Sequence, residues 1–240
     1  MIKEEYHKWY SQYLNREFEM LVFGYDGFPV ILFPTSTGRY YECKDNGLVD
    51  SVSHLINSGK IKIYCPDSIS TESWLNYSIP PGDRVKAHLS YESLLLYDVI
   101  EFAKHETGMQ KVCLAGCDLG GYYAANTAFK HPELVRFVIS MSGILNIKQY
   151  IWGYYDENCY FNNPPDYLPN LYDEWYLERF RKMGIFIGAG GLDTYSEQSR
   201  NISSILHSKG VNNWLDVQPG GRHDWELWKS LFPKYLELVN

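Results

Sequence analysis

A short strand that runs directly into a helix through a glycine-rich turn constrains the fold of this chain more than any other feature. Residues 112–115 are apolar and partly β-branched, residues 116–121 form a Gly-x-Asp-x-Gly-Gly turn, and an alanine-rich run continues to residue 130. No polar linker separates these parts, so the pattern predicts strand, sharp turn and helix. Such a tight turn predicts a strained apex residue, with the strand and the helix packed closely around it.

The apex of this turn is Asp118. Gly116 and Gly120 lie two residues before and after it, where a nucleophile elbow requires residues without side chains. In such an elbow the apex residue is usually serine. The aspartate at this position therefore decides which chemistry is available to the site.

Three segments together resemble the putative esterase family of the α/β-hydrolase superfamily, in the branch of esterase D-like and feruloyl esterase-like proteins. These segments are the 33–42 loop, the 116–121 turn and residues 221–228. The nucleophile position, an acidic residue and a histidine follow one another in the order that the superfamily requires. The resemblance extends over most of the chain and implies an α/β-hydrolase fold, with a mostly parallel central sheet flanked by helices.

The hydrophobic pattern predicts the same α/β architecture in a single domain, residues 1–240. Turn residues at 25–28 predict a hairpin between the first two strands, with Met20, Val22, Val30 and Leu32 facing a core. The expected strands are residues 18–24, 29–33, 60–65, 112–115, 135–143, 184–188 and 214–217. The expected helices are residues 42–57, 85–106, the run that follows the turn to 130, 196–209 and 224–239.

Residues 145–180 interrupt this alternation and are rich in tyrosine, tryptophan, asparagine and proline. An insertion at this place in the fold normally caps the site, so we expect a lid, with Trp152, Tyr154 and Tyr155 as substrate-binding residues. The alternative is that these rings pack against the sheet edge and one another, as aromatic side chains commonly do.

Composition excludes several classes of function. The net charge of −7 and the pI near 5.5 argue against nucleic-acid binding. The start of the chain lacks the apolar run of a signal peptide, and no stretch has the roughly 18 apolar residues of a membrane span. The five cysteines lack zinc-site spacing and fit reduced thiols. We therefore expect a cytoplasmic protein with a small-molecule substrate or ligand and no metal or other cofactor; its oligomeric state stays open.

Three polar residues are predicted to follow the carboxyl ends of neighbouring strands: Asp118, Asp193 and His223. The family resemblance implies that His223 is the general base and that Asp193 orients its imidazole. Asp224 is a competing carboxylate, but its place at a helix start is typical of a capping residue. The resemblance also implies oxyanion-hole donors at the N–H of Leu119 and of Thr35 or Ser36. The alternative for the 34–41 loop is an ordinary turn between strand and helix.

The aspartate at the apex leaves several functions open. The first is an esterase-like hydrolase that acts on an ester or ester-like bond. The second is a hydrolase of the dehalogenase or epoxide hydrolase type. In haloalkane dehalogenases and epoxide hydrolases the nucleophile is a carboxylate, already ionised at neutral pH, that attacks a saturated carbon. The third is a catalytically inactive homologue that binds a small ligand or a protein partner. A carboxylate open to substrate favours an enzyme, whereas one closed in a pair with His223 favours a binding protein.

Overall fold

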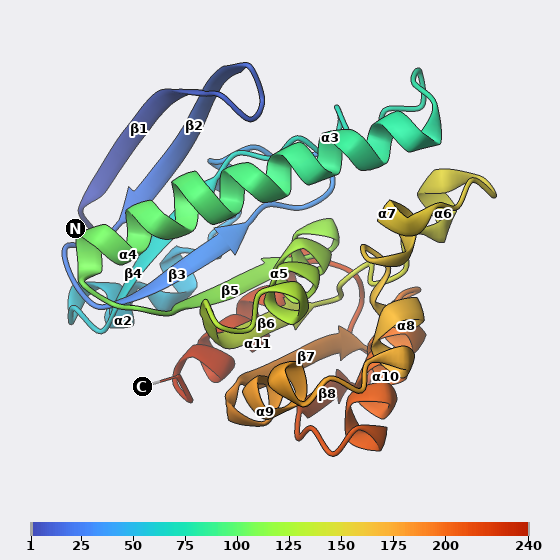
Figure 1. Cartoon of the computed structure of the whole chain (residues 1–240). Coiled ribbons are helices and arrows are strands. Elements are labelled where there is room, and N and C mark those ends of the chain that lie inside the picture. The colour runs from blue at the N-terminus through green and yellow to red at the C-terminus, as the bar shows by residue number, and fades with distance from the viewer. Residues whose placement is uncertain (1, 240) are drawn as a thin grey trace.

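The computed structural model describes residues 2–239, and its centre is an eight-stranded sheet with the order β1-β2-β4-β3-β5-β6-β7-β8 (Figure 1). The strands are β1 (Glu4–Ser11), β2 (Arg16–Phe23), β3 (Phe28–Phe33), β4 (Ile61–Pro66), β5 (Val112–Cys117), β6 (Val135–Met141), β7 (Gly184–Gly190) and β8 (Trp214–Gln218). Strands β4, β3, β5, β6, β7 and β8 run parallel to one another, and β2 pairs antiparallel with both β1 and β4. The predicted α/β-hydrolase architecture is therefore confirmed.

The predicted hairpin between residues 18–24 and 29–33 is wrong. Strand β2 pairs with β4 on one side and with β1 on the other, while β3 lies between β4 and β5. The hairpin at the amino end is instead formed by β1 and β2. The reason is burial: from Pro29 to Phe33 every residue of β3 is buried, which suits a central parallel strand rather than one partner of a two-stranded ribbon.

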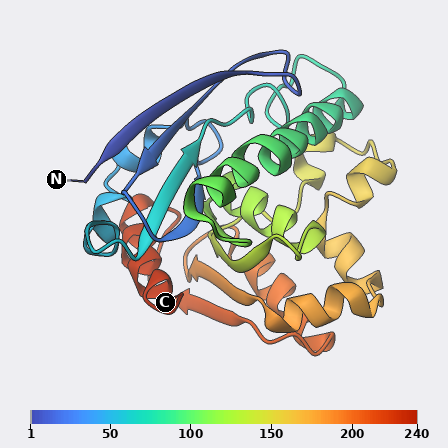
Figure 2. The same ribbon diagram turned by 60° about the vertical axis from the view of Figure 1, so that its left-hand side comes forward.

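Helices cover both faces of the sheet (Figure 2). On one face lie α3 (Pro81–Leu94), η2 (Leu95–Ile100), α4 (Glu101–Thr107), α5 (Leu119–Lys130), α9 (Glu174–Lys182) and α10 (Ser196–Ser208). On the other lie α1 (Glu42–Asp45), η1 (Asp50–Val52), α2 (Ser53–Asn57) and α11 (Trp225–Leu236). The predicted helix 42–57 is thus broken into three short turns, whereas the predicted helix 85–106 is continuous apart from its π-helical segment η2.

Two hydrophobic cores result from the alternation of side chains along the strands. In β5, Val112 and Leu114 join the core under α3 and α5, and Cys113, Ala115 and Cys117 join the core under α11. The side chains predicted to face a core, Met20, Val22, Val30 and Leu32, are all buried. This two-sided packing fixes the ends of the strands and so the loops that follow them.

Residues 145–180 form four short helices and a 3-10 turn rather than a strand. They are α6 (Lys148–Ile151), α7 (Glu157–Tyr160), α8 (Pro164–Tyr167), η3 (Leu168–Asn170) and the start of α9. Figure 1 shows α6, α7 and α8 beyond the carboxyl ends of the strands, on the side where α3 begins. The segment therefore lies at the end of the sheet where the predicted site residues occur.

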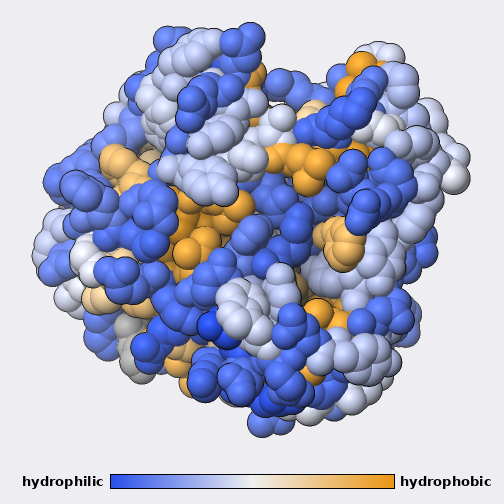
Figure 3. Space-filling view, viewed as in Figure 1, coloured by the Kyte–Doolittle hydropathy of each residue, from blue (hydrophilic) through white to orange (hydrophobic). Residues whose placement is uncertain are grey.

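The surface is largely hydrophilic in the view of Figure 3, with hydrophobic residues limited to small patches. No helix within residues 2–239 has the length and apolar character needed to cross a membrane. All five cysteines are buried and unpaired, and no group of three or more His, Cys, Asp or Glu side chains in the described part of the chain is arranged to hold a metal ion.

Candidate functional site

The turn between β5 and α5 has the geometry expected of a nucleophile elbow. Asp118 adopts φ 57° and ψ −125°, a conformation that is costly for a residue with a side chain. A Cβ at Gly116 would lie 2.4 Å from the backbone of Gly120, and one at Gly120 would lie 2.3 Å from the carbonyl oxygen of Pro34. Since neither contact is sterically tolerable, the turn requires glycine at both positions.

The three predicted catalytic residues come together at the carboxyl end of the sheet. Nε2 of His223 lies 3.2 Å from Oδ1 of Asp118, and its Nδ1 lies 3.1 and 3.2 Å from the two carboxylate oxygens of Asp193. Asp118 follows β5, Asp193 follows β7, and His223 follows β8 and precedes α11. The side chain of Asp193 is fully buried, whereas 27% of the His223 side chain is exposed to solvent. The Asp118 side chain is 11% exposed, so the imidazole is the most exposed of the three.

The competing carboxylate, Asp224, has the capping role that its position predicts. Its side chain accepts a hydrogen bond from the backbone N–H of Leu227 at 3.0 Å, at the start of α11. Asp193 is thus the carboxylate that contacts Nδ1 of His223.

Both oxygens of Asp118 have hydrogen-bond partners. Oδ1 faces His223, and Oδ2 accepts hydrogen bonds from the backbone N–H of Ser36, at 2.8 Å, and from its hydroxyl. Burial favours the neutral carboxyl, but the hydrogen bonds from His223 and Ser36 outweigh it and hold the pKa of Asp118 below its ordinary value. Asp118 is consequently a carboxylate anion at neutral pH.

His223 lies between two negative charges. Burial opposes the charged imidazolium, yet hydrogen bonds and electrostatic attraction from Asp118 and Asp193 raise the pKa of His223 to about 9. Burial also disfavours the charge on Asp193, but contacts with His223, Ser142 and the N–H of Tyr195 keep the pKa of Asp193 below its ordinary value. At neutral pH the three side chains together carry one net negative charge.

The predicted oxyanion-hole residues take different positions. The N–H of Ser36 points at Asp118, as described above. The N–H of Thr35 instead donates to Oε2 of Glu42 at 2.9 Å, and its hydroxyl also contacts that carboxylate. Leu119 is buried as the first residue of α5. Among the two loop residues, Ser36 therefore has the N–H that faces the apex.

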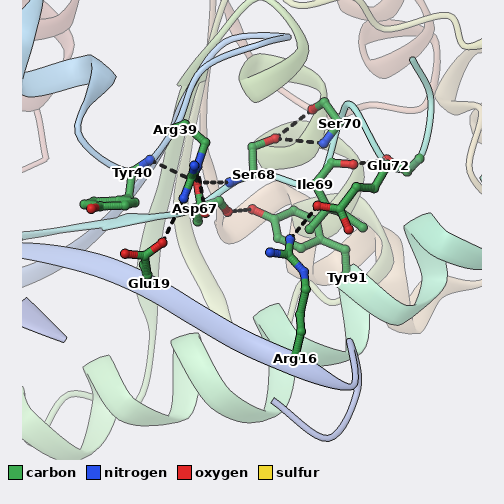
Figure 4. A network of polar contacts seen from close by, with 11 residues as sticks. Arg16, Glu19, Arg39, Tyr40, Asp67, Ser68, Ile69, Ser70, Glu72 and Tyr91 are labelled. Carbon is green, nitrogen blue, oxygen red and sulfur yellow. Dashed lines mark hydrogen bonds and ion pairs between the residues drawn. The ribbon is translucent and has the colours of Figure 1, made fainter. Parts of the chain in front are cut away.

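The loop that carries Ser36 is tied to the sheet by an ion pair (Figure 4). Nε of Arg39 donates to the two carboxylate oxygens of Asp67 at 2.7 and 2.9 Å, and the N–H groups of Tyr40 and Ser68 donate to Oδ1 of Asp67. Asp67 is 2% exposed and directly follows β4. This network links the ends of β3 and β4, and sequence reasoning did not identify it.

The three predicted substrate-binding aromatics lie at the outer side of the 145–180 segment. Trp152 stacks on Tyr77, with ring centroids 5.1 Å apart, and packs against the guanidinium of Arg84. The Tyr154 hydroxyl donates to Asp156, and the Tyr155 hydroxyl donates to Asp166. All three rings are exposed. No contact joins them to Asp118 or His223 in the described structure, so their binding role stays a prediction.

Two other tyrosines, Tyr195 and Tyr150, interact with the group formed by Asp118, Asp193 and His223, and the sequence analysis did not single them out as site residues. The ring of Tyr195 makes an edge contact with His223 at 5.3 Å. Burial raises the pKa of Tyr195 and of Tyr150, and the negative charge of Asp118 adds to the shift of both. Tyr150 belongs to the predicted lid but was one of many aromatics there. Tyr195 lies two residues after Asp193, and that spacing was the available signal.

Comparisons with known proteins identify the family of this chain. The model of the family described as "Putative esterase" matches residues 86–238, while no curated protein sequence matches the chain. Among solved structures, a ferulic acid esterase has 18% identity and a TM-score of 0.80, covering 100% of this chain and 98% of the other. An S-formylglutathione hydrolase from Agrobacterium tumefaciens has 13% identity and a TM-score of 0.76, covering 99% and 94%.

A fluorophosphonate-binding serine hydrolase of Staphylococcus aureus is similar over 100% of this chain and 99% of its own, with 14% identity and a TM-score of 0.72. At these identities the structural likeness establishes the fold. The family model covers well over half of the 240 residues and supports an esterase-like hydrolase. The chain therefore belongs to the Putative esterase family and has an α/β-hydrolase fold.

Proposed function

We propose that the chain is a hydrolase that cleaves an ester or ester-like bond, with Asp118 as nucleophile, His223 as base and Asp193 as its orienting acid. One observation carries the proposal. The carboxylate of Asp118 is held through Oδ2 by the N–H and hydroxyl of Ser36, while Oδ1 points toward the imidazole of His223. A carboxylate fixed by one oxygen keeps the other in a defined position for attack.

This arrangement favours a particular class of bond. Oδ1 attacks a saturated carbon, a new carbon–oxygen bond forms, and the group on that carbon leaves with the bonding electrons. Suitable substrates join a saturated carbon to a stable anion, as in an alkyl ester of a strong acid or an alkyl halide. Attack on a carboxylic ester carbonyl is less favourable, because the tetrahedral intermediate would expel the carboxylate of Asp118 more readily than the alkoxide, so that the high-energy mixed anhydride does not form.

The second step uses the same contacts. Water attacks the carboxyl carbon of the esterified Asp118, and negative charge develops on Oδ2, which the N–H of Ser36 stabilises as an oxyanion-hole donor. Once Asp118 is esterified its charge is gone, and one cause of the raised pKa of His223 is removed. The imidazole can then lose its proton to solvent and accept one from the attacking water. The tetrahedral intermediate collapses by breaking the bond between the carboxyl carbon and Oδ1, and the imidazolium returns the proton, so that the product leaves as an alcohol that carries Oδ1 and Asp118 regains a carboxylate.

We further propose that the chain is one domain and that residues 145–180 cap the site. Support comes from their place beyond the strand ends and from Tyr150, whose pKa responds to the charge of Asp118. Trp152, stacked on Tyr77, would then line the entrance rather than the reacting centre. A small-molecule substrate is the expected ligand class for a site of this kind.

The covalent intermediate provides the test. The parent is assayed with short p-nitrophenyl esters, with alkyl bromides for halide release and with a small epoxide. The His223→Gln variant should stop after the first step, so mass spectrometry should find the substrate's alkyl group on the peptide that contains Asp118. Asp118→Asn is the matched control and should show no adduct. If the parent turns over substrate but neither the parent nor His223→Gln carries an adduct on the peptide that contains Asp118, the nucleophilic role of Asp118 is refuted.

A second candidate function is favoured by a different aspect of the same contacts. Both oxygens of Asp118 already have partners, and His223 is held as an imidazolium between two carboxylates. This closed pair is the arrangement expected of a homologue that binds a ligand without turning it over. In that case the parent is inert with all three substrate types, and Asp118→Ser gains hydrolysis of p-nitrophenyl esters.

A further inference from the structure

Two neighbouring residues of the loop after β3 bind carboxylates in the same way. Thr35 donates its N–H to Oε2 of Glu42 at 2.9 Å, and its hydroxyl oxygen lies 2.9 and 3.0 Å from the two oxygens of that carboxylate. Ser36 donates its N–H and its hydroxyl to Oδ2 of Asp118. The loop therefore connects the apex of the elbow to a second carboxylate.

The carboxylate of Glu42 is held by Thr35 and not by a cation. Glu42 is the half-buried first residue of α1, and no Lys, Arg or His pairs with it in the described part of the chain. Burial raises the pKa of Glu42, hydrogen bonds from Thr35 oppose that shift, and the negative charge of Asp118 adds to it. A carboxylate is costly at such a place, so its presence calls for a reason other than an ion pair.

The contacts of Thr35 supply that reason, because they set the direction of the next N–H. Glu42 holds both the N–H and the side chain of Thr35, and the carbonyl oxygen of Thr35 accepts the N–H of Gly38 at 3.1 Å. This carbonyl and the N–H of Ser36 belong to one planar trans peptide and point in opposite directions. With Thr35 held at both ends, the N–H of Ser36 is directed at Asp118.

Gly38 leaves the space that the carboxylate of Glu42 occupies. A Cβ at position 38 would lie 1.9 Å from Oε2 and 2.4 Å from Cδ of Glu42. The φ of Gly38 does not lie in the left-handed region, so alanine can adopt the same backbone. A side chain at position 38 would therefore displace the carboxylate from Thr35.

We propose that Glu42 is a positioning residue: it holds both donors of Thr35 and thereby keeps the N–H of Ser36 directed at Oδ2 of Asp118. The consequence for catalysis rests on the proposed function, in which this N–H stabilises the charge that develops on Oδ2. The contacts themselves are independent of any reaction.

The test follows the backbone amide of Ser36 by NMR. Thr35–Ser36 is the only Thr-Ser step in the sequence, so cell-free synthesis with carbonyl-¹³C threonine and ¹⁵N serine selects one amide signal. In the parent its proton should lie downfield and exchange slowly with solvent. Glu42→Ala should shift the signal toward its position in Asp118→Ala, which lacks the acceptor, and speed exchange about tenfold, as expected for one lost hydrogen bond. Glu42→Gln keeps an acceptor for Thr35 and should stay close to the parent.

A second variant and a matched control complete the comparison. Gly38→Ala leaves Glu42 in the chain but displaces its carboxylate, so it should reproduce the effect of Glu42→Ala and keeps the test usable if that variant folds poorly. Asp45→Ala removes one negative charge from the same helix, where the Asp45 carboxylate is paired with Lys44 rather than with the loop. It should leave the Ser36 signal unchanged.

An unchanged Ser36 signal in Glu42→Ala and Gly38→Ala would overturn the proposal even if both variants are less stable, because a purely structural role lowers stability without redirecting this N–H. A parent whose Ser36 amide exchanges as fast as that of Asp118→Ala would overturn it as well. The readout uses no substrate, so an inert parent would count against the proposed hydrolase and leave the role of Glu42 intact.

Discussion

Replacing Asp118 by asparagine is expected to change how the stability of this protein depends on pH. The asparagine would retain the shape of the side chain but remove one of the two charges that flank His223. The pKa of His223 is about 9 in the folded protein against an ordinary value of 6.5. At 1.36 kcal/mol per pKa unit this difference is about 3 kcal/mol, and solvent screening of the partly exposed ring reduces it to about 2 kcal/mol.

The sign follows from linkage. A histidine whose pKa is raised by folding stabilises the folded state fully below its unfolded pKa and loses that contribution as pH rises through its folded pKa. Between pH 6.5 and 9.5 the parent should therefore lose about 2 kcal/mol of unfolding free energy through this group. In Asp118→Asn the loss should be about half as large, because Asp193 remains.

Urea unfolding at half-unit pH steps from 6 to 10 measures this loss, with His223→Gln as the reference for all other titrating groups. The relevant quantity is the difference between each protein and that reference. If the parent and Asp118→Asn lose the same free energy across this interval, Asp118 does not hold the imidazolium, and the electrostatic account of the site fails.

Three further changes test the scaffold around the site. Gly120→Ala places a Cβ 2.3 Å from a backbone carbonyl and should lower the unfolding free energy by about 3 kcal/mol in urea titrations, whereas Gly191→Ala, with its nearest atom at 3.3 Å, should cost far less. Arg39→Met leaves buried Asp67 without its ion-pair partner and should lower the unfolding free energy by about 2 kcal/mol. The double variant Arg39→Met/Asp67→Asn should regain part of this loss, and losses that simply add would contradict the coupling of the two residues. Asp224→Ala removes the cap of α11 and should lower stability by about 1 kcal/mol, with little change at the catalytic group if the cap is its whole role.

The elbow could be read from the sequence because its main constraint is local. The clash between a Cβ at Gly116 and the backbone of Gly120 arises within one turn, so the spacing of these glycines around Asp118 carries the information. Asp193 and His223 could be placed for a related reason: each follows a strand in a parallel sheet, and the carboxyl ends of such strands meet at one edge. Asp224 was recognised from the preference of helix starts for aspartate.

The errors arose where long-range contacts decide. Residues 25–28 have the composition of a hairpin turn, but β4 inserts between the two strands that they join. The nearly continuous apolar run of Phe28–Phe33 was the available sign of a central strand. The choice between Thr35 and Ser36 as donor was left open by the sequence, because no sequence pattern specifies that the Glu42 carboxylate accepts the N–H of Thr35.

The aromatic segment shows the same limit. Many rings lie within residues 145–180, and composition alone cannot rank their distances from a site. The charge of Asp118 contributes to the raised pKa of Tyr150. Trp152, two residues later, instead packs on Tyr77 and Arg84 and is exposed to solvent. Tyr150 lies within α6 (Lys148–Ile151), whereas Trp152 follows its end with φ 48°. The different environments of the two rings depend on tertiary packing.

The glycine contacts of the elbow also bear on how such a protein can change over evolutionary time. Side chains are sterically excluded at positions 116 and 120, and the sheet and α5 are built around that exclusion. Position 118 is different, since it projects a side chain to the end of the sheet without adding atoms to either core. Exchanging this one residue can therefore replace one reaction by another, or by none, while the topology of the scaffold and the packing of its two cores are inherited intact.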